Sequence, residues 1–292
     1  LQWYRLQCYA WYRFSAIVIY FQQSSCFPQI EHTPVGALLL IMLLGCTLLP
    51  LPLKWDVRGW TEMHPLNGPA WSLYYEYIAN ILYALFIRRF NKIALTVLVV
   101  IAACFTVYRS LTAPMGDMVG GWALNWEQQY VGFVRLMYPF FGGLLLSRLG
   151  WLIRIKKRAF WYCALIIIVI LSIPRLGGEE HYWMNGLYES FCIIFIFPII
   201  VSMGAGGKVT GKYSSRICKF LGDISYPIYI THYPLIYIYT AWVCNNNATI
   251  TEGIPYMILV LVGAIALAYA SLKLYDEPVR RRLTECFLKK TK

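Results

Sequence analysis

Long apolar stretches recur along the 292 residues, and they limit the possible folds more than any other feature. A stretch of about 18 or more apolar residues is long enough to cross the bilayer as a helix. Only 14% of the residues are charged and 59% are hydrophobic, whereas an ordinary soluble domain carries about 25% charge. A soluble protein of this composition could not cover its surface with polar groups. We therefore predict an all-α fold, a polytopic bundle of transmembrane helices.

The apolar stretches predict eight or nine membrane spans. The weakest candidate is 7–21, where Arg13 interrupts a short aromatic-rich run. The other eight lie near 35–53, 70–87, 92–109, 131–147, 159–174, 184–203, 222–243 and 254–274. Several are shorter than the usual length, so their ends are approximate.

Lysine and arginine gather in alternate loops from residue 54 onward. One set of loops is basic, and the set between them gathers Asp117, Glu127, Glu179, Glu180 and Glu252. The basic set is Arg88, Arg89, Lys92, Arg148, Arg154, Lys156, Lys157, Arg158, Lys208, Lys212, Arg216 and Lys219, followed by the basic C-terminal tail. By the positive-inside rule, this set and the C-terminus are cytoplasmic.

The net charge of +12 and the nine cysteines have simple interpretations. Basic residues cluster at the ends of apolar segments, so we expect membrane orientation and no nucleic-acid binding. The cysteines are scattered without a C-x-x-C pair. We interpret them as small buried hydrophobes, and expect neither a disulfide framework nor a metal site.

Three ionisable residues stand out inside predicted spans, where a charge costs about 2.5–3.5 kcal/mol at mid-helix. They are Glu76, Arg135 and Glu189. The predicted orientation places all three roughly 6–9 Å below the outer ends of their helices. Equal depth and opposite charges indicate one polar cluster facing a shared cavity. The alternative is a set of ion pairs that only holds the bundle together.

His232 is predicted to lie near mid-membrane, roughly 15 Å along its span. Ser225 and Tyr226 precede it, and Pro227 and Pro234 bend the helix. Such kinks expose backbone carbonyls and open space for water or substrate. The alternative is a histidine that only packs against its neighbours.

Four stretches, in order, resemble motifs of the acyltransferase 3 family of integral membrane enzymes. Trp71, Ser72, Leu73 and Glu76 match a W-S-L-x-x-E segment. The other matches are "FVRLMYPFFGGLLLSR" (133–148), "FLGDISYPIYITHYPL" (220–235) and "YDEPVRRRL" (275–283). The resemblance covers 35–283, and leaves 1–34 as a diverged or partial N-terminal segment and 284–292 as a basic cytoplasmic tail.

The resemblance implies an enzyme that moves an acyl group, commonly acetyl, from acyl-CoA to a hydroxyl. Acyl-CoA (acetyl-CoA) would be a co-substrate, with no bound cofactor. The acceptor would be a lipid-linked or envelope glycan, such as lipopolysaccharide or another polysaccharide. The other partners would be membrane lipids, and the location the bacterial inner membrane. On this basis Glu76 and His232 are the candidate catalytic residues. The candidate substrate-binding residues are Trp71, Ser72, Arg135, Glu189, Ser225 and Tyr226.

The chain departs from the family pattern at its start. The family opens with an R-x10-H helix, whose histidine is taken as the base, and then an F-F-x-x-S-G segment; the 292 residues contain neither. We expect a truncated chain, an incomplete gene product, or a variant in which His232 and Glu76 replace the missing base. An inactive remnant and a transporter or flippase are the alternative functions. Transporters often contain internal repeats, and finding none favours the enzyme.

Overall fold

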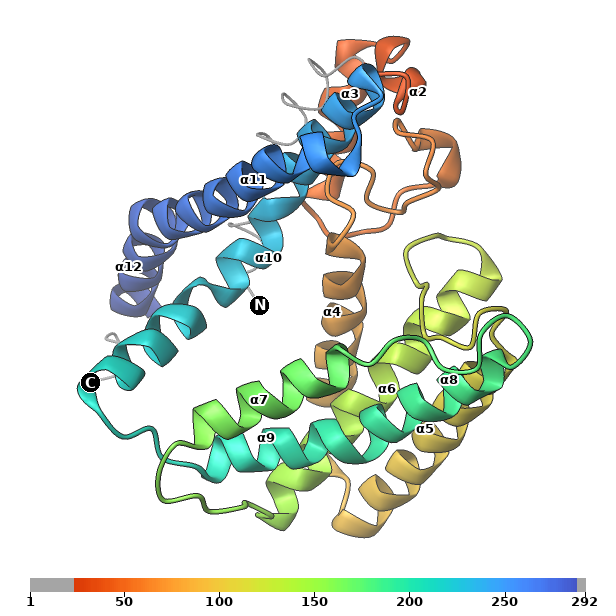
Figure 1. Ribbon diagram of the computed structural model, residues 1–292. Helices are drawn as coiled ribbons and strands as arrows, with labels where there is room; N and C mark the ends of the chain where they lie inside the picture. The colour runs from red at the N-terminus through yellow and green to blue at the C-terminus, as the bar shows by residue number, and fades with distance from the viewer. Residues whose placement is uncertain (1–23, 288–292) are drawn as a thin grey trace. The chain divides into compact units, whose positions relative to one another are not determined.

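The computed structural model describes residues 24–287 and divides into two compact units (Figure 1). The first unit contains the described residues up to Tyr74, Trp122–Leu124, and the chain from Phe220 onward. The second contains Tyr75–Gly121 and Asn125–Lys219. Residues 24–287 form helices and connecting loops without a strand, which confirms the all-α prediction for them. The predicted span at 7–21 lies outside the described residues.

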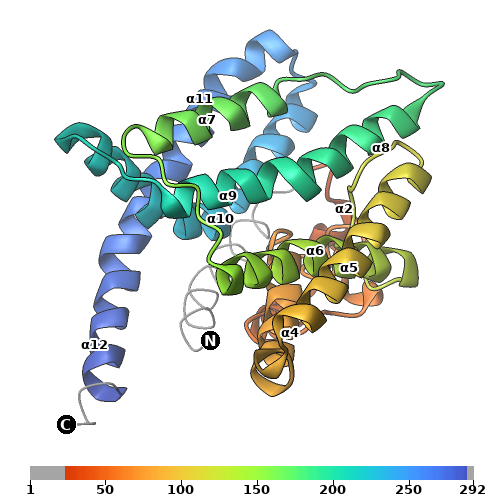
Figure 2. The ribbon, with the colours of Figure 1, turned by 90° about the horizontal axis from the view of Figure 1, so that it is seen from below.

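The second unit is built from α4 to α9. Helix α5 packs against α6 and α8, and α9 packs against α6 and α7 (Figure 2). A π-helical turn, η3, joins α8 to α9 without a break, so Tyr182–Gly206 is one continuous helix. The bounds are α4 Ala70–Leu85, η2 Ile87–Arg89, α5 Lys92–Thr112, α6 Trp126–Leu149, α7 Ala159–Leu171, α8 Tyr182–Phe191, η3 Cys192–Ile196 and α9 Phe197–Gly206.

Side chains next to the helix starts fix where α5 and α6 begin. Asn91 accepts a hydrogen bond from the backbone N–H of Ala94, and Asn125 accepts one from Gln128, each over 2.8 Å. Both satisfy backbone donors that a helix leaves without an internal partner. Gly150, at φ 68°, ends α6 in the left-handed conformation that glycine adopts without strain.

The first unit contains the first turn of α4 and the long C-terminal helices. Helix α10 begins in the second unit and continues into the first; Thr249 and Glu252 then form a reciprocal capping box at the start of α11. The bounds are α2 Pro28–Glu31, α3 Val35–Gly45, η1 Leu53–Trp55, α10 Lys212–Asn246, α11 Ile250–Ser271, the π-helical turn η4 Leu272–Asp276 and α12 Glu277–Phe287.

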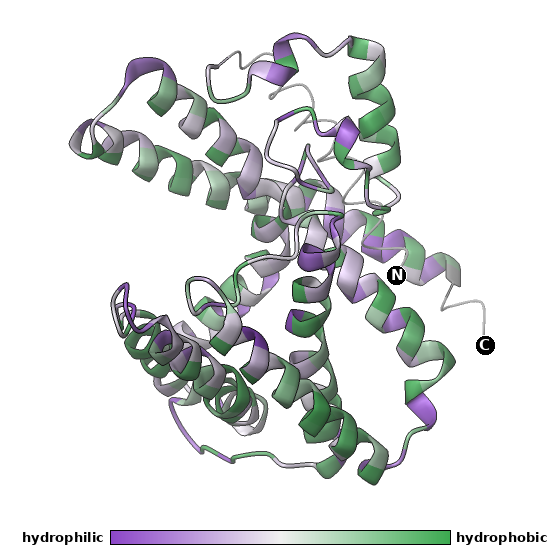
Figure 3. Ribbon diagram, turned by 90° about the vertical axis from the view of Figure 1, so that its right-hand side faces the viewer, coloured by the Kyte–Doolittle hydropathy of each residue, from purple (hydrophilic) through white to green (hydrophobic). Residues whose placement is uncertain are grey.

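Four of the described helices are long and apolar enough to cross a membrane. They are Lys92–Thr112, Trp126–Leu149, Tyr182–Gly206 and Ile250–Cys286. Hydrophobic residues follow one another along the helices, while hydrophilic residues gather in the loops (Figure 3). Helices α3 and α7 are apolar but shorter. The chain therefore has the character of an integral membrane protein, and the cytoplasmic C-terminus stays a prediction.

The predicted span at 35–53 is wrong as a single membrane-crossing helix. Helix α3 has only 11 residues, about 16 Å, against a hydrocarbon core about 30 Å thick. After it the chain is mostly irregular, and Leu51 and Met63 are joined by a backbone hydrogen bond of 2.9 Å. Only part of its apolar side chains is buried inside the first unit, where Leu48 and Leu51 share a core with Ile230 and Tyr237 of α10.

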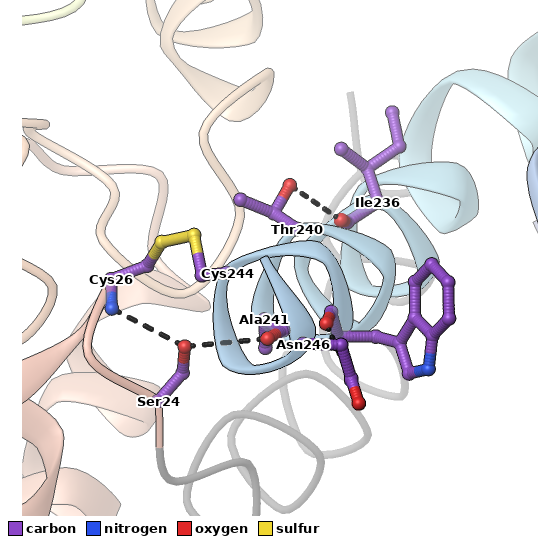
Figure 4. Close-up of a disulfide and its surroundings, with 8 residues drawn as sticks. Ser24, Cys26, Ile236, Thr240, Ala241, Cys244 and Asn246 are labelled. Atoms are coloured by element: carbon purple, nitrogen blue, oxygen red, sulfur yellow. Dashed lines mark hydrogen bonds between the residues drawn. A yellow bond between two sulfur atoms is a disulfide. The ribbon is translucent and has the colours of Figure 1, made fainter. Parts of the chain in front are cut away.

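Two cysteines form a disulfide, which corrects the interpretation of all nine as unpaired buried hydrophobes. Cys26 and Cys244 are bonded, with Cα atoms 6.4 Å apart (Figure 4). This distance lies in the usual range for a disulfide. Ser24 supports the bond, because its hydroxyl accepts from the N–H of Cys26 and donates to the carbonyl of Ala241. The bond ties the chain before α3 to the C-terminal end of α10.

Reduction of the wild-type chain should expose two further thiols. We expect denatured protein to gain two labels from a thiol-reactive polyethylene glycol after reduction, because Cys26 and Cys244 are blocked beforehand. Gel mobility counts the labels. The Cys26→Ser/Cys244→Ser variant is the matched control and should gain none. Equal labelling of the wild type before and after reduction would show that the pair is not bonded.

Helix α8 approaches α5 closely enough that only glycine fits at one position. A Cβ atom at Gly186 would lie 2.3 Å from the carbonyl oxygen of Ser110 on α5. Small residues at such crossings let two membrane helices pack closely. Next to Gly186, the Asn185 side-chain amide donates to the carbonyl of Gly116 over 2.7 Å. This bond holds the loop that follows α5 against α8.

Gly186→Ala should destabilise the second unit. The added methyl overlaps a backbone carbonyl, and overpacking of this kind typically costs about 1–3 kcal/mol. Gly143→Ala on α6 is the control, since nothing lies within 4 Å of the new Cβ atom. Thermal unfolding in detergent, followed by circular dichroism, compares the two variants. Equal midpoints would contradict the close approach of α8 and α5.

Candidate active site

The start of α4 is bound to α10 through the hydroxyls of Ser72 and Tyr229. The two oxygens lie 2.5 Å apart, and the Tyr229 hydroxyl also donates to the carbonyl of Pro69 over 2.8 Å. The Ser72 hydroxyl also lies within donating distance of the Pro69 carbonyl, at 3.3 Å, so the two hydroxyls share this acceptor and either can donate to the other. Two segments about 160 residues apart in the sequence therefore meet in the first unit, and each carries one of the sequence motifs.

A second hydrogen bond between these segments depends on Pro234. Proline has no backbone N–H, so the carbonyl four residues earlier, that of Ile230, loses its helical donor. The side-chain amide of Asn67, a fully buried residue, donates to this carbonyl over 3.2 Å. The kink predicted from the sequence thus supplies the acceptor that holds the loop before α4.

His232 lies one turn beyond Tyr229 on α10, half-buried between Tyr229 and Tyr233. Its Nδ1 atom is 2.8 Å from the carbonyl oxygen of Ile228. A carbonyl only accepts, so Nδ1 carries the proton of the neutral ring. The lone pair is then on Nε2, the arrangement that a general base requires.

The other motif residues of these two helices have different surroundings. Trp71 and Tyr226 are half-buried, and Tyr226 packs against the core of the first unit. Ser225 is exposed, and its hydroxyl donates to the carbonyl of Gly222 over 2.8 Å. Glu76 follows Ser72 by one turn on α4; its side chain is exposed, and its carbonyl accepts from Asn80 over 2.8 Å.

Arg135 and Glu189 both bind the backbone of the loop 116–121. The Arg135 guanidinium donates to the carbonyl of Gly120 over 2.5 Å, and a Glu189 carboxylate oxygen accepts from the N–H of Met118 over 2.9 Å. In the same loop, Asp117 pairs with Arg175 over 2.7 Å. Charges that the sequence placed in one polar cluster therefore position one loop of the second unit.

Arg135 also lines a cavity of about 340 Å³ between α5, α6 and the continuous α8–α9 helix. Most of its wall is apolar; Thr106 and Tyr138 are the other polar side chains that line it. Pro139, Gly142 and Gly143 lie along the α6 wall, where small side chains leave space. Among residues 24–287, no group of three or more His, Cys, Asp or Glu side chains is placed to hold a metal ion.

A buried charged pair lies in the loop before α4. Arg58 is 1% exposed and forms an ion pair with Glu62, which is 7% exposed. The Arg58 guanidinium lies over the ring of Tyr237 at 3.7 Å from its centroid and over Trp60 at 5.0 Å. The Tyr237 hydroxyl accepts from the N–H of Gly68 over 3.2 Å. Charge, ring and backbone together fix this loop on α10.

Burial shifts the pKa values of three side chains in this loop. It raises the pKa of the Glu62 carboxyl to about 8, with a further rise from the charge of Asp56. It lowers the pKa of Arg58 to about 9 and the pKa of the fully buried His64 to about 3. For both Arg58 and Glu62, the loss of water is the largest cause of the pKa shift. His64 is neutral in the folded chain at every pH near 7.

The family model described as an acyltransferase domain, acyltransferase 3, matches residues 3–272 of the 292. The chain belongs to the acyltransferase 3 family. Family membership and the apolar helices together make it a membrane protein for which acyltransferase activity is implied. No curated protein and no solved structure matches the chain.

Several residues around this candidate site were missed by sequence reasoning. Neither Arg58 nor His64 is among the candidate residues predicted from the sequence. A signal was present: Arg58 and Glu62 are four residues apart in "WDVRGWTEMHPLNGP" (55–69), beside two tryptophans. Asn67 could have been found from Pro234, since the carbonyl that this proline leaves unbonded requires a donor.

Acid should destabilise the wild-type chain through His64. An unfolded histidine has a pKa near 6.5, so below that pH the unfolded state binds a proton that the folded state does not. The free energy of unfolding then falls as the pH decreases from about 6.5 toward 3, by about 1.4 kcal/mol per pH unit. His64→Gln should lose this part of the slope, measured by unfolding in detergent at several pH values.

The exposed His32 provides the matched control. His32→Gln should keep the wild-type pH dependence, because the side chain at this position is exposed to water in the folded chain. Identical slopes for the wild type and His64→Gln would mean that His64 is protonated to the same extent in the folded and the unfolded chain.

Proposed function

We propose that this chain transfers an acyl group, acetyl in particular, from acyl-CoA to a hydroxyl of an envelope sugar or polysaccharide. Family membership supports acyl transfer. The observation that carries the proposal is the joining of the Trp71–Ser72 segment to α10 beside His232, through the Ser72–Tyr229 contact of 2.5 Å. Family motifs from distant parts of the sequence thus meet at a possible base.

In this proposal His232 is the general base. Its Nδ1–H bond to Ile228 fixes the ring, and Nε2 accepts the proton of the acceptor hydroxyl. The hydroxyl oxygen then attacks the thioester carbonyl of the donor. The new C–O bond forms as the C–S bond breaks, and coenzyme A leaves with the thiol sulfur, which takes up a proton. Acyl-CoA is a co-substrate here, and no bound cofactor is needed.

The remaining motif residues would bind and orient substrate. Glu76 would accept a hydrogen bond from the acceptor sugar, or orient a histidine. Trp71 would offer a ring face to the sugar, and Ser72, held by Tyr229, would keep that helix start in place. Ser225 and Tyr226 would lie along the acyl path. Arg135 and Glu189 would act through the loop 116–121 that both bind.

The predicted orientation suits a donor and an acceptor on opposite sides of the membrane. The basic loops and the C-terminus would face the cytoplasm, where acyl-CoA is made, and α4 would begin at the outer side. The acceptor would be a lipid-linked or envelope glycan at the outer leaflet of the bacterial inner membrane. Eight or nine spans remain part of this proposal, of which four have helices of sufficient length and apolarity.

Acyl transfer in proteoliposomes tests the proposal. Labelled acetyl-CoA is supplied on one side and a lipid-linked glycan on the other, and label in the glycan is measured. His232→Gln should lower kcat by about 10²–10⁴-fold, the usual contribution of a general base. Glu76→Gln should lower kcat/KM. His32→Gln, at an exposed loop histidine, should keep the wild-type rate.

Each outcome decides something different. Wild-type rates in His232→Gln would remove His232 from the mechanism, and wild-type rates in Glu76→Gln would remove Glu76. Glycan crossing the bilayer without acquiring label would favour a transporter. Neither labelled nor transported glycan, with any acyl-CoA offered, would favour an inactive remnant.

A further inference from the structure

The segment between α6 and α7, "WLIRIKKR" (151–158), joins exposed apolar side chains to four basic ones. Trp151 is 71% exposed, and Leu152 and Ile153 are also exposed. Arg154, Lys156, Lys157 and Arg158 follow, all exposed. Aromatic and basic residues of this kind are enriched where a membrane meets water.

The backbone of this segment is fixed, although its side chains are exposed. The Ser202 hydroxyl on α9 donates to the carbonyl of Trp151 over 2.7 Å and accepts from the N–H of Ile153 over 3.0 Å. Further along, the N–H of Lys208 donates to the carbonyl of Ile155 over 2.9 Å. The positions of the basic residues relative to α9 are therefore set by the fold.

A cavity of about 350 Å³ lies directly behind the apolar half of the segment. This volume falls within the range of small-molecule sites, about 300–1,000 Å³. It shares Leu146 and Pro198 with the cavity of about 340 Å³ that Arg135 lines. Ser202 is the one hydroxyl-bearing residue that lines it, and its walls include Trp151, Leu152, Ile153, Ile194, Pro198 and Ile199. The space suits a hydrocarbon chain.

No carboxylate is near these basic residues in the sequence. The chain has no Asp or Glu from 128 to 178, nor from 190 to 222. Nearby Arg148 has a structural role, because it donates to the carbonyls of Ile87, Arg88 and Phe90 in the turn after α4. The four basic residues of 151–158 are thus left to bind an anion supplied from outside the chain.

We propose that 151–158 and the cavity behind it form a binding site for an anionic phospholipid of the cytoplasmic leaflet. One acyl chain occupies the cavity walled by Leu152 and Ile199. The phosphate lies among Arg154, Lys156, Lys157 and Arg158, with Trp151 at the level of the headgroups. Positive charge next to a hydrocarbon cavity matches an amphiphile of this kind. This inference is independent of the proposed acyl transfer.

Lipid exchange in nanodiscs, read by native mass spectrometry, tests the site. The wild type should retain one phosphatidylglycerol in preference to phosphatidylcholine. Lys156→Gln/Lys157→Gln/Arg158→Gln should reduce that preference by tenfold or more, because each basic residue near the headgroups adds about 1 kcal/mol of attraction, or about fivefold. Ile199→Trp, which fills the cavity, should lower retention of both lipids.

A matched control removes the same charge elsewhere in the second unit. Arg88→Gln/Arg89→Gln/Lys92→Gln changes three exposed basic residues that line neither cavity, and should keep the wild-type preference. Equal losses in the two triple variants would overturn a defined site in favour of diffuse charge attraction. Equal retention of the two lipids by the wild type would overturn it as well. Displacement of the lipid by free coenzyme A would assign the basic residues to a soluble phosphate ligand instead.

Discussion

The first unit depends on one buried cation. Arg58 is withdrawn from water, so its charge must be compensated by Glu62 and by the rings of Tyr237 and Trp60. Removing Glu62 would leave the Arg58 charge buried without its partner, which typically costs about 3–5 kcal/mol. The same Tyr237 accepts from Gly68, just before α4. The position of the Ser72–Tyr229 contact therefore depends on how the Arg58 side chain is stabilised in the loop before α4.

Hydropathy predicted the positions of the helices well. It could not show whether an apolar segment is surrounded by lipid or by other parts of the protein. The starts of α4, α5 and α7 agree with the predicted spans to the residue. At 35–53 the prediction failed beyond Gly45 because Leu48 and Leu51 are apolar for another reason: they are 4% and 3% exposed inside the first unit. An apolar sequence shows only that water is excluded, and the surroundings that exclude it are set by tertiary packing.

Site residues could be predicted where their own segment identifies them. Their partners from distant segments could not be predicted. Glu76 and His232 could be singled out because polar groups in apolar spans are costly. The partners of the site residues came from distant segments: Asn67 from 163 residues before Ile230, and Cys26 from 218 residues before Cys244. A scattered set of cysteines contains no information on which two will be close. The carbonyl left open by Pro234 is an intermediate case, since the need for a donor is local and its source is not.

The second unit separates its charges along the predicted membrane normal, and the two ends use them differently. Two of its carboxylates, Asp117 and Glu189, lie toward the predicted outer end, where they are bonded to a guanidinium and to the backbone of one loop. At the other end the basic side chains of 151–158 stay exposed, and only their backbone is held. Charged side chains that are paired within the chain stabilise the fold. Exposed charged side chains on a fixed backbone are suited to bind a ligand of opposite charge. The loop 116–121 is therefore best explained as scaffold, and the segment 151–158 as the proposed binding surface.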